Sequence, residues 1–304
     1  MIAPYYGESK TYTFDQAAAK TLLNKKSSLI KVNCNSAQVL KDLGLGQNTK
    51  ITSISVGEEI FDYSFDFRNC SMRGNKRNTV WSNKPIKEAA ALAIAKEFMS
   101  NKYFGKKVFN QYGTPIVIYR NGNNIRPYIL KEAASTTAVA DDDISLSGVD
   151  IDPTDTGDIN IEPEYTSFSI LFPYTINGTP IYNAYGNRAG VTVEVTADGV
   201  TNVNAQLLPF KGAARNAEKL SGDDMVKFVQ KGGNNSYRGS EKEVVFKKPQ
   251  RVLVLFNLWR NNTNELYMSS GIRFASDIKQ DQWSAQNYEM IISDYKIGNN
   301  NFGW

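Results

Sequence analysis

The chain has 304 residues, of which 41% are hydrophobic and 22% are charged, and its formal net charge is +4. This composition is ordinary for a folded protein of one or two domains. The sequence contains no histidine, which excludes a histidine base, histidine-dependent triads and histidine-ligated metal sites. No apolar run reaches the roughly 18 residues that a membrane-spanning helix requires.

Charge is distributed unevenly along the chain. Residues 1–131 hold 20 Lys and Arg against 9 Asp and Glu, 132–164 hold none against 10, and 165–304 hold 15 against 12. The acidic middle segment also lacks aromatic residues, a composition typical of linkers. We therefore expect an N-terminal domain (1–131), an acidic linker (132–164) and a C-terminal domain (165–304). The basic residues of the first part are scattered and match no known motif, so we expect no nucleic-acid binding.

The first part of the chain alternates helical and strand patterns. A capping box over 13–16 predicts a helix that ends near Leu23. The sequence 60–67 alternates aromatic and polar residues, which predicts a strand with one buried face and one wet face. Ser82 or Asn83 is expected to cap the longest helix, over 85–99, with Pro85 in its first turn. The shorter elements expected are a strand over 28–32, a helix near 36–43 and strands over 51–56, 115–119 and 127–130.

A hairpin over 190–207 is the most detailed expectation. Three valines, Val191, Val193 and Val195, alternate with polar residues before the turn Ala197-Asp198-Gly199. A three-residue loop keeps the apolar faces of both strands together, and a two-residue Asp198-Gly199 loop would mix them. The expected pairs are therefore Val195 with Thr201, Val193 with Val203 and Val191 with Ala205. Gly199 is expected at positive φ.

Two further elements of the second half have clear signals. Ser221-Gly222-Asp223-Asp224 predicts a helix start, and Gly232-Gly233 predicts its end. Residues 251–259 are apolar on both faces, which predicts a central strand covered on both sides. The overall expectation is an α+β protein with two helix-on-antiparallel-sheet domains.

Candidate sites are few. Asp150, Asp152, Asp155 and Asp158 have a spacing that suits calcium, although the segment lacks the glutamate that completes an EF-hand loop. A solvated acidic linker explains the same residues. Cys34 and Cys70 cannot hold a structural zinc alone, and either form one disulfide or remain reduced. The aromatic residues that we consider as ligand contacts are Trp81, Trp259, Trp283, Trp304, Tyr182 and Tyr185.

A family resemblance adds to these patterns. The residues that carry this resemblance are Phe172-Pro173, Asn177-Gly178-Thr179-Pro180-Ile181-Tyr182, 190–195 and 198–201, and a capped helix follows them. This part of the second half resembles the Yyc-type accessory proteins and PepSY-like domains. The resemblance covers about 165–275 and, more faintly, 60–130. It implies helix-on-sheet units outside the cytoplasm, commonly tethered to the membrane. Yyc-type proteins bind a sensor kinase, and PepSY-like domains are thought to restrain proteases, so it implies a protein partner and transfers no catalytic residue.

Three functions remain open on the sequence alone. The first is a non-catalytic, secreted or surface-tethered binding protein with a protein partner and no cofactor apart from the calcium considered above. The second is a carboxylate-based enzyme acting on glycans, which requires two carboxylates facing one cleft. The third is a structural subunit of the cell surface or an appendage. The start Met1-Ile2-Ala3-Pro4 has no signal-peptide pattern, so extracytoplasmic placement requires a leader or anchor that has been removed.

Overall fold

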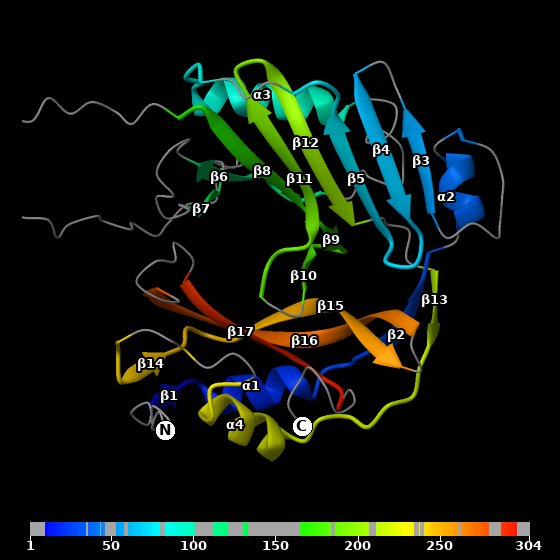
Figure 1. Ribbon diagram of the computed structural model, residues 1–304. Coiled ribbons are helices and arrows are strands. Elements are labelled where there is room, and N and C mark those ends of the chain that lie inside the picture. Colours follow the sequence, from blue (N-terminus) through cyan, green and yellow to red (C-terminus); the bar gives the residue numbers. More distant parts are fainter. Residues whose placement is uncertain are drawn as a thin grey trace, which may run out of the picture.

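The computed structural model describes 10–34, 36–42, 44–45, 53–57, 60–79, 83–100, 112–120, 130–132, 165–183, 186–206, 211–233, 237, 240–260, 263–279 and 287–296. It shows a mixed α/β fold in which strands predominate (Figure 1). Two large sheets lie one above the other. Helix α3 (Glu88–Met99) lies on the outer side of the upper sheet, and α1 (Gln16–Leu23) and α4 (Gly222–Gln230) lie below the lower one. No helix in the described ranges has both the length and the hydropathy to span a membrane.

We call the upper sheet sheet I. Within the described residues it has eight strands, and all of its neighbouring strands are antiparallel. Its order is β3 (Ser53–Gly57), β4 (Phe61–Asp66), β5 (Ser71–Lys76), β12 (Gly199–Gln206), β11 (Gly190–Thr196), β8 (Ser167–Pro173), β6 (Ile116–Arg120) and β7 (Leu130–Glu132). Helix α2 (Ser36–Asp42) lies near β3 at one end of the sheet (Figure 1).

We call the lower sheet sheet II. Across the part of the chain that is described it has seven strands, and β10 with β15 is its parallel pair. Its order is β13 (Lys211–Ala214), β2 (Leu29–Asn33), β16 (Thr263–Lys279), β15 (Gln250–Arg260), β10 (Thr179–Asn183) and β9 (Thr175–Ile176), with β17 (Asn287–Ser293) also paired to β16. A separate parallel pair joins β1 (Thr11–Thr13) to β14 (Glu243–Val245).

The two sheets do not follow the expected division into 1–131 and 165–304. In sheet I, β5 pairs with β12 and β6 pairs with β8; in sheet II, β2 pairs with β16. Both sheets therefore combine strands from the two ranges. Periodicity identifies a strand by its own residues, whereas its partner is set by contacts between distant parts of the chain. The linker that we expected over 132–164 lies outside the described residues apart from Glu132.

The expected helices form, with differences at two helix starts. Thr13, the first residue of the expected capping box, belongs to β1, so α1 begins after Asp15. Asp15 caps α1 by accepting a hydrogen bond from the Ala18 amide, and Ser221 caps α4 by accepting one from the Asp224 amide. Gly232 and Gly233 follow α4 with φ of +83° and +63°, as their positions after a helix end predict. Helix α3 begins at Glu88, after Lys87, and not near Pro85.

The start of helix α3 has no side-chain cap. The residue before it, Lys87, makes no capping hydrogen bond. Packing stabilises this helix instead, since Ala91, Ala95 and Met99 are buried against sheet I. Small alanines allow the helix backbone to approach the strands closely.

Burial on β4 and β15 follows the predicted faces. Along β4, Phe61, Tyr63 and Phe65 are buried while the residues between them are open or half-buried. On the central strand β15, Val254 and Leu255 point to opposite faces and both are buried. The expectation that β15 is covered on both faces is therefore confirmed.

The hairpin of β11 and β12 confirms the predicted register away from its turn. The observed pairs are Val191 with Ala205 and Val193 with Val203. All four side chains are buried, with exposed fractions of 0% to 5%. The hydrophobic pattern therefore identified the buried face correctly.

The turn itself is tighter than predicted. Thr196 lies opposite Gly199, and Val195 lies opposite Val200 in place of Thr201. The register shifts next to Val195. Gly199, which we assigned to the loop, pairs with Thr196, and the extra residue is Thr201, which forms a bulge in β12. Gly199 has φ of +101°, as expected, and its Cβ position is open.

Variants of this hairpin test both faces. Gly199→Ala should lower the free energy of unfolding by about 1 kcal/mol, because the strain comes from the backbone alone. Val193→Ala removes fully buried methyl groups and should cost on the order of 2 kcal/mol. Glu194→Gln, on the opposite face, should change stability by at most about 0.5 kcal/mol. Urea denaturation measures all three. Equal losses at Val193 and Glu194 would contradict the assignment of faces.

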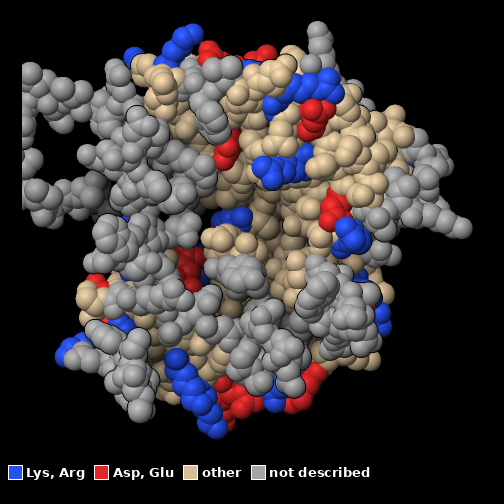
Figure 2. Space-filling model, in the orientation of Figure 1, with Lys and Arg blue, Asp and Glu red and all other residues tan. Residues whose placement is uncertain are grey.

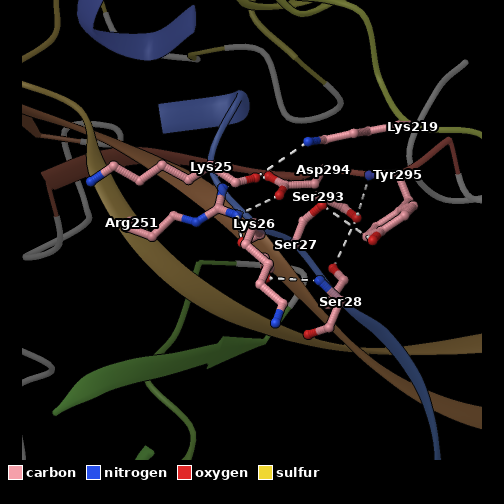
Figure 3. Close-up of polar contacts among 11 residues, drawn as sticks. Lys25, Lys26, Ser27, Ser28, Lys219, Arg251, Ser293, Asp294 and Tyr295 are labelled. Atoms are coloured by element: carbon pink, nitrogen blue, oxygen red, sulfur yellow. Dashed lines mark hydrogen bonds and ion pairs between the residues drawn. The ribbon is translucent and has the colours of Figure 1, made fainter. Parts of the chain in front are cut away.

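A polar cluster joins the N-terminal and C-terminal parts of sheet II (Figure 3). Two hydrogen bonds run from the Arg251 guanidinium to the Asp294 carboxylate, at 2.7 and 2.6 Å, and the Asp294 side chain is fully buried. Arg251 also donates to the Lys26 carbonyl at 3.3 Å. Nearby, the Tyr295 hydroxyl donates to the Ser27 hydroxyl at 3.2 Å. Burial raises the pKa of Asp294 above its ordinary value, although the bonds from Arg251 oppose this.

Removing one partner of the Arg251–Asp294 ion pair should destabilise the protein more than replacing both partners with apolar residues. Asp294→Ala leaves a largely buried guanidinium without its carboxylate and should destabilise the protein by about 3–5 kcal/mol. The double variant Arg251→Met with Asp294→Leu should be less destabilised than Asp294→Ala, because no charge remains buried. Urea denaturation of both variants provides the comparison. If the double variant is as unstable as Asp294→Ala, the loss of stability does not come from an unpaired buried charge, and this explanation is wrong.

Candidate functional site

One face of sheet I is polar across several strands. Ser55 lies opposite Ser64, Ser64 opposite Arg73, Arg73 opposite Asn204 and Asn204 opposite Thr192. Successive side chains of a strand point to opposite faces, so these five residues form a row on one face of the sheet. The row crosses five neighbouring strands, from β3 to β11.

The other face of sheet I is the apolar core. Phe65, Val193 and Val203 are at most 1% exposed, and α3 packs over this side with Ala91 and Ala95. Because Phe65, Val193 and Val203 turn toward α3, the alternating polar side chains of the row turn toward sheet II. The alternation that folds the sheet therefore also builds the polar row.

A cleft of about 650 Å³ lies over this polar face. Its volume is within the usual range of about 300–1,000 Å³ for small-molecule sites. Figure 2 shows the molecule hollowed between the two sheets, with basic and acidic side chains near the hollow. The polar residues of sheet I that line it are Ser53, Ser55, Ser64, Asp66, Arg68, Ser71, Arg73, Thr192, Asn204 and Gln206, and Asn183, Arg188 and Leu255 line it beside them.

The described lining is net positive. Three of these residues are arginines, Arg68, Arg73 and Arg188, and Asp66 is the single carboxylate among the described lining residues. Arg68 and Asp66 form a loose ion pair, with 3.6 Å between Nε and Oδ1. Clefts that carry one sign of charge concentrate ligands of the opposite sign.

Asp66 is held by the turn between β4 and β5. Its Oδ1 accepts hydrogen bonds from the amides of Arg68 at 2.9 Å and Asn69 at 3.4 Å, and its Oδ2 accepts one from the Asn69 side chain at 2.7 Å. Burial acts to raise the pKa of Asp66, but these hydrogen bonds outweigh it, and the pKa is lowered. Asp66 is therefore ionised at neutral pH and is unsuited to the role of a general acid.

Arg188 is held against an aromatic ring. Its guanidinium lies over the Tyr182 ring at 5.1 Å, a cation–π arrangement. Nη1 makes a long contact of 3.5 Å with the Tyr182 hydroxyl. Nε is buried and has no hydrogen-bond partner in the described part of the chain. A buried donor without a partner is uncommon and points to an absent acceptor.

The two cysteines lie together beside the turn that carries Asp66. Cys34 follows β2 of sheet II, and Cys70 ends the β4–β5 turn of sheet I with φ of +48°. Both thiols are free, and they contact each other. The contact with Cys34 and then burial raise the pKa of the Cys70 thiol. Gln206, which lines the cleft, donates to the Cys70 carbonyl at 2.6 Å.

The other residues selected from the sequence lie elsewhere or are not described. Asp150, Asp152, Asp155 and Asp158 fall outside the described residues, so the calcium prediction stays a prediction. The same is true of Trp81, Trp283, Trp304 and Tyr185, and nothing is described of the Trp259 side chain. Tyr182 is buried at 4% exposure beneath Arg188. Among the described residues, no group of three or more His, Cys, Asp or Glu could hold a metal ion.

The acidic pair at the start of α4 is not part of the cleft. Asp223 pairs with Lys20 at 2.8 Å, and Asp224 pairs with Lys296 at 3.3 Å. These pairs attach α4 to α1 and to the residues after β17.

Sequence reasoning did not find the cleft, because the polar row that lines the cleft combines residues from distant strands. The available signal was the alternation of serine and arginine with apolar residues over 53–56 and 71–73.

Comparisons with known proteins provide no family. No family model matches the chain, and no curated protein matches it. One solved structure, an uncharacterised protein from Eubacterium rectale ATCC 33656, is similar at 12% sequence identity with a TM-score of 0.35. The alignment covers 89% of this chain and 84% of that one.

The cysteine contact predicts a specific redox behaviour. A mild oxidant such as oxidised glutathione should convert Cys34 and Cys70 to one intramolecular disulfide, with two thiols lost per chain and no dimer formed. Before oxidation, Cys70 should react slowly with thiol reagents at pH 8, because its raised pKa keeps it protonated. Thiol titration with and without denaturant, with Cys34→Ser as control, measures both effects. Disulfide-linked dimers would contradict the contact.

Proposed function

We propose that this protein is a non-catalytic binding protein whose ligand occupies the cleft between the two sheets. The observation that carries the proposal is the polar row on sheet I. Hydroxyl, amide and guanidinium groups from five strands face the same hollow and offer many hydrogen bonds to a ligand. Rigid strands hold these groups in place, which favours selective binding.

The composition of the cleft favours binding over glycan hydrolysis. A glycosidase of the usual kind needs two carboxylates across the scissile bond. The described lining offers Asp66 alone, and its oxygens accept hydrogen bonds from its own turn. The described lining therefore lacks the second carboxylate that the enzymatic alternative requires.

The wider role is part of the same proposal. We place the protein outside the cytoplasm, secreted or tethered at the cell surface, as the resemblance to Yyc-type and PepSY-like proteins implies. A protein partner is a prediction from the same resemblance.

A cleft-filling variant tests the site. Thr192→Trp places a large side chain on the polar face of β11, and Ser240→Trp makes the matched change at an exposed position outside the cleft. In a thermal-shift screen of small polar ligands, hits should stabilise the wild type and Ser240→Trp but not Thr192→Trp. Hits that stabilise all three proteins equally would place the ligand elsewhere. Chemical conversion of a hit would contradict the non-catalytic role.

A further inference from the structure

Two arginines of the cleft have no anionic partner among the residues that the structure describes. Arg73 extends from the exposed side of β5, and its side chain makes no hydrogen bond or ion pair in the described part of the chain. Arg77, in the turn directly after β5, is different. Its Nε and Nη2 donate to Asp62 at 2.9 and 2.6 Å. Unpaired arginine in a cleft is a typical feature of carboxylate and phosphate recognition.

Arg188 supplies the second unpaired charge. Stacking on Tyr182 fixes its guanidinium plane at the edge of the cleft, and its buried Nε lacks an acceptor among the described residues. Arg273, which also lies over Tyr182, is neutralised because it pairs with Glu289. Arg188 is therefore a fixed donor for an oxygen atom that the described chain does not provide.

Neutral hydrogen-bonding groups lie beside Arg73 on the polar row. Thr192 and Asn204 lie opposite each other on neighbouring strands, with Arg73 opposite Asn204 on the other side. Arg73 and Thr192 are thus two strands apart, about 10 Å at the usual strand spacing. Asn204 donates its Nδ2 to Asn202 at 2.6 Å, which leaves its Oδ1 to accept from a ligand hydroxyl.

We propose that the ligand of the cleft is a hydroxylated oxyanion, in which a carboxylate or phosphate group binds to Arg73 and Arg188 and the hydroxyl groups bind to Thr192 and Asn204. This inference rests on the proposed function, because it names the ligand class of the same cleft. It adds the requirement of negative charge. Sugar acids and sugar phosphates share this chemistry.

Glucuronate, glucose 6-phosphate and glucose are suitable probes, since they share one ring and differ in charge. Binding is followed by NMR titration up to about 10 mM at constant ionic strength, a range that includes weak monosaccharide affinities. Both anions should bind at least about tenfold more tightly than glucose. The tighter of the two identifies a carboxylate or a phosphate as the preferred group.

Arginine variants locate the charge. Arg73→Gln and Arg188→Gln should each weaken binding of the preferred anion by about tenfold and leave that of glucose unchanged. Arg77→Gln removes the same charge from the same sheet at a paired position and should change affinity less than about twofold. Circular dichroism confirms that each variant is folded.

The outcomes separate this inference from the proposed function. If glucose binds as tightly as both anions and loses affinity in Thr192→Trp, the cleft is a ligand site but the requirement for an anion is wrong. If none of the three probes binds, or if Arg77→Gln weakens binding as much as Arg73→Gln, the inference is overturned. The wider ligand screen with Thr192→Trp then decides whether the cleft binds any ligand.

Discussion

The pairing of β5 with β12 is the contact on which the rest of sheet I depends. It joins strands that are more than a hundred residues apart and connects the three-stranded meander β3–β4–β5 to the hairpin β11–β12. Without it, each piece would have too few strands to cover an apolar face alone. Together they provide the face on which α3 packs, and the same pairing aligns Arg73 with Asn204 and Thr192.

The sequence predicted local structure well. Alternation identified the buried faces of β4 and β11, and the helix signals at Ser221 and Gly232 were read correctly. These features depend on residues close together in the chain, where periodicity and capping chemistry are informative. The bulge near Val195 was missed, because a two-residue turn with a bulge and a three-residue loop give the same register beyond the turn.

The arrangement of strands and the cleft were not predictable in this way. Arg73 and Arg188 belong to strands or connections that no local pattern brings together. Which strands become neighbours is decided by the shape of the whole core, and sequence periodicity does not report it. The predicted α+β class agrees with the structure only in outline, since the fold is mixed α/β with strands predominant. The candidate site became visible once the register across β5, β12 and β11 was known.

The long-range closure of sheet II also affects how the chain folds. Strand β2, near the N-terminus, pairs with β16, and β1 pairs with β14, so the first elements to be synthesised find their partners only after most of the chain exists. Such non-local pairing makes folding slow, since a long loop must close before its contacts can form. Until β16 emerges, the edges of β2 stay unpaired and prone to aggregation.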